Sequence, residues 1–197
     1  MSLTLAVKPT LVDRIVPSSL AADIALVVAG VAFTAIAAQL QFSVPGVPVP
    51  FTFQTLAVLL TGAALGSTRG ALSMALYALV GLVLPVFSGG SQGASVLFGA
   101  TGGYIFGFIL ASYLVGYLAE RNFSNKFLKM ALAYLIGSAA IYAVGVPVLA
   151  QVAFKGNLGL AVQFGLVPFL IWDAAKAIVA GGLLPGAWAL VRKVKGN

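Results

Sequence analysis

The sequence predicts an all-α integral membrane protein with six transmembrane helices and both termini in the cytoplasm. Hydrophobic residues make up 61% of the chain, and the mean hydropathy is +1.09. Charged residues make up only 8%, whereas soluble domains carry about a quarter. Apolar runs close to the roughly 20 residues that cross a bilayer recur from end to end. Lipid is therefore the expected solvent of most of the surface.

We expect one transmembrane domain over residues 1–197, with a cytoplasmic tail at 1–19, a six-helix bundle at 20–190 and a basic cytoplasmic tail at 191–197. The helices are expected at about 24–40, 53–67, 70–86, 104–119, 128–151 and 160–190. The first run is long enough to span the bilayer, which favours a membrane helix over a cleaved signal peptide. No internal repeat is visible, which argues against an inverted-repeat transporter.

The connectors differ in character. Alternating prolines at 44–54 exclude continuous helix and favour extended backbone. The turn "GSTR" closes a tight helical hairpin, and residues 88–103 form a glycine-rich segment expected to be irregular. The loop at 120–129 is rich in charge, and a short link around Lys155 precedes the last helix.

The basic residues indicate how the bundle is oriented. With six spans, nine of them fall on the side of the termini, namely Lys8, Arg14, Arg69, Arg121, Lys126, Lys129, Arg192, Lys193 and Lys195. Only Lys155 falls on the opposite side, and Lys176 is embedded in an apolar run. This positive-inside bias predicts a multi-pass protein of the cell membrane with cytoplasmic termini.

The composition excludes most enzyme chemistry. The chain has no Cys and no His, and its only acids are Asp13, Asp23, Glu120 and Asp173. Thiolate and imidazole metal sites and a Ser-His-Asp triad are thereby excluded, and no cofactor or metal is expected. An intramembrane enzyme would have to combine Asp173 with Ser88 or Tyr104, without a second buried acid. The basic residues form no stripe, so nucleic acid is not expected as a partner.

Two charges interrupt the apolar stretch "FLIWDAAKAIVA". Asp173 and Lys176 are three residues apart, on one face of a helix. Each costs about 2.5–3.5 kcal/mol to insert, and Asp173 is expected to be the only embedded acid. They could form a purely structural ion pair or a proton relay. The hypothesis that we favour is that they form the polar centre of a cavity that opens outward, because embedded ionisable residues generally mark ligand or ion paths.

The outward connectors supply further candidates for such a cavity. Neutral hydrogen-bonding residues and one aromatic residue are Thr52, Gln54, Ser88, Ser95, Thr101 and Tyr104. Gly89 and Gly90 would allow backbone N–H groups to approach a ligand, although a merely flexible loop is the alternative. No Lys or Arg follows these glycines in a P-loop pattern, so this chain is not expected to bind ATP.

A stripe of small residues lies on the first helix. Ala21, Ala25 and Ala29 are spaced by four, which lets another helix pack closely. That helix could belong to a partner or to the same bundle, and the spacing does not distinguish the two.

Three motifs occur in order along the chain: "VPVPFTFQTLAVLLTGAALGSTRGALSMALYALVGLVLPVFSGG", "GATGGYIFGF" and "PFLIWDAAK". With them, residues 24–190 resemble the BioY family, the biotin-specific substrate-binding (S) subunits of energy-coupling-factor (ECF) vitamin transporters. The resemblance implies a six-helix subunit that captures biotin from outside. It also implies a transmembrane coupling subunit at the small-residue face and cytoplasmic ATPase subunits, which alone use ATP. A solitary member could form a homo-oligomer.

The resemblance also suggests roles for the embedded pair. Asp173 as acceptor and Lys176 as donor would match the ureido edge of biotin, or Lys176 would bind the carboxylate. Gln54, Ser88, Gly90, Thr101 and Tyr104 are the next candidates. The alternative function is a proton-coupled secondary transporter of a small organic acid, with Asp173 as the protonated group.

Overall fold

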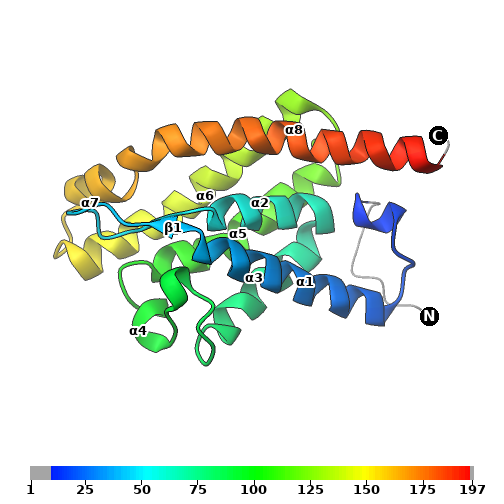
Figure 1. Cartoon of the computed structure of the whole chain (residues 1–197). Helices are drawn as coiled ribbons and strands as arrows, with labels where there is room; N and C mark the ends of the chain where they lie inside the picture. Colours follow the sequence, from blue (N-terminus) through cyan, green and yellow to red (C-terminus); the bar gives the residue numbers. More distant parts are fainter. Residues whose placement is uncertain (1–9, 196–197) are drawn as a thin grey trace.

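The computed structural model describes residues 10–195, apart from the side chain of Lys195, and these residues form a bundle of helices (Figure 1). Lys8 and residues 196–197 of the predicted tails lie outside the described part. The longer helices are α1 (Leu20–Gln39), α2 (Gln54–Leu65), α3 (Ser67–Val80), α5 (Gly102–Ala119), α6 (Phe127–Ala153) and α8 (Leu170–Lys195). The short elements are η1 (Val12–Arg14), β1 (Gln41–Phe42), β2 (Phe51–Thr52), η2 (Ser88–Gly90), α4 (Ala94–Leu97), α7 (Leu158–Gly165) and η3 (Val167–Phe169).

Four helical segments of the described chain are long and apolar enough to cross a membrane. They are α1, α5, α6 and the segment from Leu158 to Val194 that contains α8. The helices α2 and α3 have 12 and 14 residues, which is roughly 18 and 21 Å at 1.5 Å per residue. Both are shorter than a hydrocarbon core of about 30 Å. The described chain therefore contains six helices of 12 residues or more, whereas six complete membrane spans stay a prediction.

The centre of the bundle is α5, which packs against α2, α3 and α6. Its buried face contains small residues that bring the backbones together. A Cβ atom on Gly107 would lie 2.9 Å from the carbonyl oxygen of Ile141 in α6, and one on Gly116 would overlap the backbone at Gly66. Close approach of this kind is typical of packed membrane helices.

The two irregular connectors carry more structure than a coil. The proline-containing connector forms an antiparallel ribbon in which Gln41 pairs with Thr52 and Phe42 with Phe51, so the fold is mostly rather than entirely helical. The glycine-rich segment, expected to be irregular, contains η2 and the helical turn α4. Both connectors lie at the end of the bundle opposite the start of α1 (Figure 1).

A buried ion cluster joins the segment before α1 to α3. Arg69, expected in a connector, lies instead within α3 and is 2% exposed. Its guanidinium binds the carboxylates of Asp13 at 2.7 Å and Asp23 at 2.6 Å. Asp23 is 1% exposed, so the expectation that Asp173 is the only embedded acid is wrong. This cluster was not predicted, because Asp23 and Asp13 are 46 and 56 residues away from Arg69 in the sequence.

Hydrogen bonds fix the carboxylate of Asp13 in this cluster. Burial alone would raise the pKa of Asp13, but the backbone N–H of Thr10, the Arg69 guanidinium and the Thr10 hydroxyl all donate to it. These donors outweigh the burial and hold the pKa of Asp13 below its ordinary value of 3.8. The ionised carboxylate of Asp13 therefore attaches the segment before α1 to the bundle.

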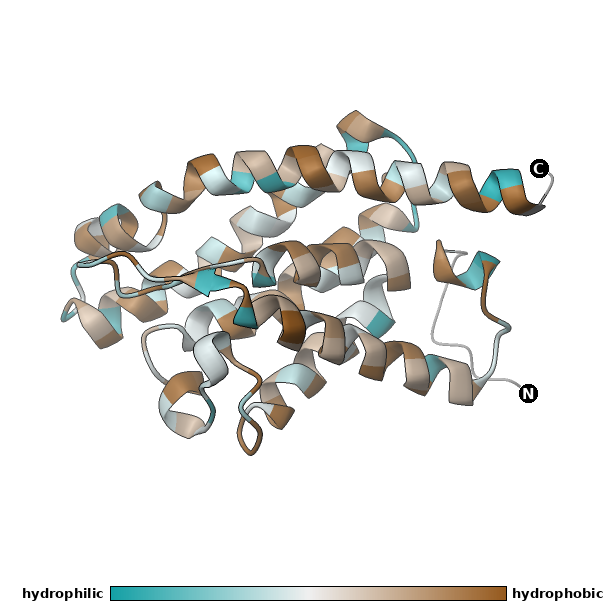
Figure 2. Ribbon diagram, viewed as in Figure 1, coloured by the Kyte–Doolittle hydropathy of each residue, from teal (hydrophilic) through white to brown (hydrophobic). Residues whose placement is uncertain are grey.

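Charge is distributed unequally between the ends of the bundle. The start of α1 and the end of α8 lie at one end (Figure 1). Figure 2 shows hydrophilic colour near both of these points and in the loop between α5 and α6, with hydrophobic or neutral colour along most of the helices. Lys155 lies in the link between α6 and α7, at the other end. Among the residues that the structure describes, the basic side chains are thus separated as predicted, whereas the orientation in the membrane stays a prediction.

Candidate binding site

The pair in the last helix is buried near that helix's beginning. Asp173 lies in the first turn of α8, where the helix dipole favours a negative charge, and Lys176 follows one turn later. Asp173 is 4% exposed and Lys176 is 8% exposed. The Lys176 Nζ atom lies 3.7 Å from Asp173 Oδ1, which is longer than a charge-assisted hydrogen bond. The two groups are paired loosely.

Each charge also has a neutral partner from another helix. The Tyr142 hydroxyl of α6 donates to Asp173 Oδ2 at 2.6 Å, and Lys176 Nζ donates to Thr55 Oγ1 of α2 at 2.8 Å. Neither residue was predicted, because a single Tyr or Thr in an apolar helix carries no signal of what it faces. The only hint for Thr55 is its place directly after the candidate Gln54.

A small cavity of about 50 Å³ adjoins the pair. It is lined by residues from the proline-containing connector, α2, α5, α6, η3 and the start of α8, namely Val49, Pro50, Thr52, Thr55, Tyr104, Phe108, Ile141, Tyr142, Phe169, Asp173 and Lys176. Of the predicted site residues, Thr52, Tyr104, Asp173 and Lys176 line it. Phe51 stacks on Phe169 beside it, with ring centres 4.3 Å apart.

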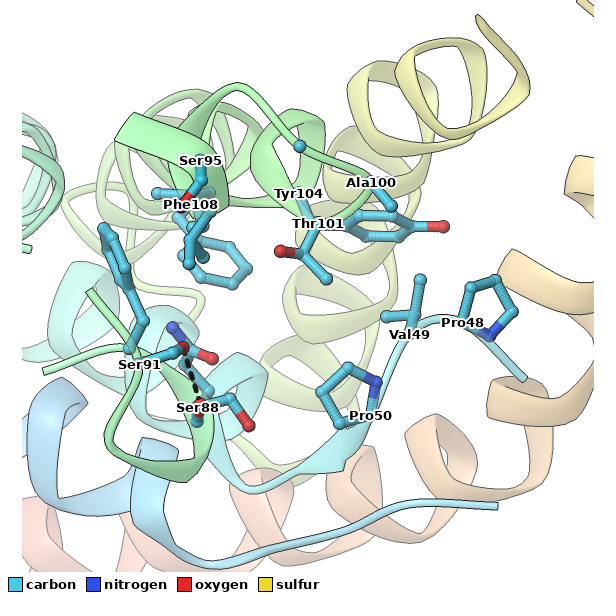
Figure 3. A pocket seen from close by; sticks show the side chains of 15 residues that line it. Pro48, Val49, Pro50, Ser88, Ser91, Ser95, Ala100, Thr101, Tyr104 and Phe108 are labelled. Atoms are coloured by element: carbon cyan, nitrogen blue, oxygen red, sulfur yellow. Dashed lines mark hydrogen bonds between the residues drawn. The ribbon is translucent and has the colours of Figure 1, made fainter. Parts of the chain in front are cut away.

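A larger cavity of about 360 Å³ lies next to the small one (Figure 3). Its predicted polar lining residues are Gln54, Ser88, Ser95, Thr101 and Tyr104. Figure 3 shows Thr101, Tyr104 and Phe108 on one side of the cavity, with Val49 and Pro50 opposite them. The volume falls within the range of about 300–1,000 Å³ that is typical of small-ligand pockets.

The two cavities share one wall. Val49, Pro50, Tyr104 and Phe108 line both, so the small cavity beside the charged pair adjoins the larger one at these mostly apolar side chains. All candidate residues were expected to line one chamber. The structure distributes them over two adjoining chambers, with Tyr104 in both.

The available hydrogen-bonding groups differ among the candidates. The Ser88 hydroxyl is buried without a hydrogen-bond partner among the described residues, which leaves it free to meet a ligand. The Tyr104 hydroxyl instead donates to the Gly165 carbonyl at 2.8 Å, and Gln54 Nε2 donates to the Tyr77 hydroxyl at 2.7 Å. Tyr104 and the amide nitrogen of Gln54 therefore already have structural bonds.

The two candidate glycines lie outside both linings. Gly89 and Gly90 have φ values of 67° and 70°, which favour glycine. The Gly90 N–H donates to Gln39 Oε1 of α1 at 2.8 Å. In this structure Gly90 contacts α1, neither glycine lines a cavity, and a ligand-binding role for Gly89 and Gly90 stays a prediction.

The small residues of α1 lie on the outside of the bundle. Ala21, Ala25 and Ala29 are all exposed, whereas Gly30 and Thr34 face inward and are buried. The alanine stripe therefore does not serve internal packing, which was one of its two interpretations.

Comparison with known proteins agrees with this architecture. The BioY family model matches residues 8–193. The "Biotin transporter BioY" of Thermotoga maritima is 40% identical over 79% of this chain and 90% of its own length. The "Probable biotin transporter BioY" of Pyrococcus horikoshii is 37% identical over 81% of this chain and 92% of its own length.

A solved structure has the same fold. It is described as the crystal structure at 2.1 Å of the S-component for biotin from an ECF-type ABC transporter. It superposes with a TM-score of 0.73 over 90% of this chain and 92% of its own, at 24% identity. The resemblance expected from the three motifs is confirmed over nearly the whole sequence, and the chain belongs to the BioY family.

Proposed function

We propose that this chain is a multi-pass membrane subunit that binds biotin and captures it from outside the cell for uptake. The observation that carries the proposal is membership of a family whose relatives are named biotin transporters, together with a ligand-sized cavity beside a buried charged pair. A binding subunit needs no catalytic group, in keeping with a chain that lacks His and Cys.

Biotin has functional groups that suit the two chambers. Its ureido ring has two N–H donors and one carbonyl acceptor, which Asp173 and Lys176 complement as acceptor and donor. Its apolar arm would then pass Val49 and Pro50 into the larger cavity. There the carboxylate would meet neutral donors, of which the unpartnered Ser88 hydroxyl is the clearest. In the opposite orientation, Lys176 would bind the carboxylate.

The charges of the buried pair favour the first orientation, in which the ureido ring meets Asp173 and Lys176. The small chamber has about 50 Å³ of free space, so either end of the ligand must displace part of the shared wall. The ureido edge can satisfy both members of the pair at once, whereas a carboxylate beside Lys176 would also lie close to the Asp173 carboxylate. Like charges at that distance repel each other in a buried site.

Titration calorimetry of the purified protein without ATP tests the proposal. We expect one biotin per chain with a saturable heat, and weaker binding of desthiobiotin. The methyl ester of biotin should bind nearly as tightly as biotin if the carboxylate meets only neutral donors. A large loss with the ester would instead support the Lys176–carboxylate orientation. Absence of any biotin binding by folded protein would overturn the proposal.

For energy supply, we propose a transmembrane coupling subunit and cytoplasmic ATPase subunits, with the termini of this chain on the cytoplasmic side. The exposed stripe of Ala21, Ala25 and Ala29 is the proposed contact with the coupling subunit. Co-purification from native membranes, compared between the natural chain and Ala25→Trp, tests the contact. If the natural chain retains no partner, the result supports uptake by the solitary protein or by a homo-oligomer instead.

A proton-coupled secondary transporter is the second candidate from the sequence, and the family comparisons do not favour it. Uptake into proteoliposomes containing this chain alone, driven only by a pH gradient, separates the two. Under the first proposal, such uptake is not expected.

A further inference from the structure

A third cavity lies on the other side of the charged pair. It has a volume of about 480 Å³ and is an open groove between α6, α7 and α8, lined by Leu135, Ser138, Ala139, Tyr142, Ala143, Val146, Pro147, Leu158, Leu166, Leu170 and Asp173. Tyr142 and Asp173 also line the small chamber. Their 2.6 Å hydrogen bond therefore forms part of the partition between this groove and the interior.

The surroundings of the groove are those of a lipid-facing surface. It lies between α6 and the segment containing α8, both of which are long and apolar enough to span a membrane. Its rim residues Leu135, Leu158 and Leu170 are about half exposed. Within the described residues, the polar side chains of the lining are Ser138, Tyr142 and Asp173, and none of the three is exposed. A groove between two such segments is therefore expected to face hydrocarbon.

The dimensions of the groove correspond to one leaflet. Along α6 the lining extends from Leu135 to Pro147, which is roughly 18 Å at 1.5 Å per residue. One half of a hydrocarbon core is about 15 Å thick. A single acyl chain lying along α6 would therefore cover the groove from its mouth to near the middle of the membrane.

A positive charge stands beyond the mouth. The link between α6 and α7, the helices that line this end, contains Lys155, an exposed residue with a φ of +50°. Apart from buried Lys176, it is the only basic side chain that the described chain carries at this end of the bundle. A lone exposed cation at the membrane surface attracts a lipid phosphate.

From these features we propose that the groove between α6 and α8 is a binding site for a phospholipid of the leaflet at the Lys155 end. One acyl chain lies along α6 from Pro147 to Leu135, and the headgroup phosphate lies near Lys155. The lipid covers the outer face of the Tyr142–Asp173 partition and thereby excludes water from the charged pair on that side. None of the features that define this site depends on what the interior chambers bind.

Photo-crosslinking in vesicles tests the site. The full chain is placed in phosphatidylcholine vesicles that contain phosphatidylglycerol with a diazirine on one acyl chain, and labelled residues are mapped by mass spectrometry. We expect excess label at 135–147 and 158–170 over the exposed face of α5, at Phe106, Leu110 and Tyr113, which also faces lipid. Uniform labelling of all lipid-facing helices would overturn the proposal.

Variants sharpen the experiment. Ala139→Trp fills the groove and should lower its labelling to the level of α5, whereas Ala189→Trp, at an exposed alanine of α8 outside the lining, should leave it unchanged. Ala143→Trp serves if Ala139→Trp does not fold. Lys155→Glu should reduce the excess for the anionic lipid. Retained excess in a folded groove-filling variant contradicts the assignment. Biotin is not part of the readout, so failure here leaves the proposed function untouched.

Discussion

Two buried charge clusters occupy opposite ends of this bundle, and they are built differently. Around Arg69, two carboxylates lie within 2.7 Å of one guanidinium, and none of the cavities described above is lined by these residues. At the other end, Lys176 and Asp173 are 3.7 Å apart, each completes its bonding with a neutral hydroxyl, and both line a cavity.

The contrast separates a structural role from a binding role. The Arg69 cluster is closed, because its guanidinium and carboxylates bind one another through short charge-assisted hydrogen bonds. The Lys176 pair is open, because neutral hydroxyls can be exchanged for ligand groups at little loss. Buried ion pairs are not by themselves evidence of a site, whereas a loosely paired set beside free volume is.

The largest effect is expected from Arg69→Ala. It leaves two carboxylates without their cation, and breaking a buried ion pair in this way costs about 3–5 kcal/mol of stability. Thermal unfolding followed by circular dichroism in detergent measures the change. Arg121→Ala is the matched control, because Arg121 is exposed and only stacks on Tyr117 at 4.1 Å. Equal melting temperatures for the two variants would contradict the structural role.

Binding should respond most strongly to the open pair. Asp173→Asn or Lys176→Ala should weaken biotin by at least about thirtyfold, since loss of one partner of a buried pair costs about 2–5 kcal/mol. The melting temperature should fall less than in Arg69→Ala. Calorimetry with Lys126→Ala, at an exposed basic residue, provides the control. Normal affinity in both site variants would show that the ligand is bound elsewhere.

Smaller changes are expected from the neutral partners. Tyr142→Phe and Thr55→Val each remove one hydrogen bond to a charged group, worth about 1.5–3 kcal/mol. If these bonds orient the pair for the ligand, biotin affinity falls, and the melting temperature falls less than in Arg69→Ala. Tyr113→Phe, at an exposed tyrosine, should have no effect. A drop in stability without a drop in affinity would assign both residues to structure alone.

The smallest effect concerns pH and the closed cluster. The pKa of Asp13 is below its ordinary value of 3.8, so its stabilising contribution is complete above that value and is lost as the pH falls through the lower folded-state pKa. The melting temperature should therefore decline below about pH 4. Asp13→Asn should make this decline shallower, with little change at pH 7 relative to Arg69→Ala. An unchanged acid slope would mean that other carboxylates control it.

Local pattern was enough to predict most helices and the embedded pair. The apolar runs at 24–40 and 128–151 correspond closely to α1 and α6, because uninterrupted apolar residues leave helix as the structure that satisfies the backbone in lipid. Residues three apart lie on the same face of a helix, so the spacing of Asp173 and Lys176 predicted that the two side chains meet. These features depend on neighbours in sequence.

Features that depend on distant residues were not predicted. The third helix was expected at 70–86 but begins at Ser67, whose N–H and hydroxyl both donate to Glu120 Oε1 at 2.8 Å. It ends at Val80, and the ring of Phe87 packs directly against the next residue, Gly81, where it excludes any side chain. The partition between the chambers likewise depends on how the ribbon lies over α5, which no local spacing encodes.

Division of the interior by Val49 and Pro50 makes the length of a molecule a criterion of selection. A compound that reaches past these side chains collects favourable contacts in two compartments while losing its rigid-body freedom only once. An analogue with the same ring and a shorter arm fills one compartment and makes no contacts in the other. Truncation of the tail should therefore reduce affinity as severely as alteration of the ring.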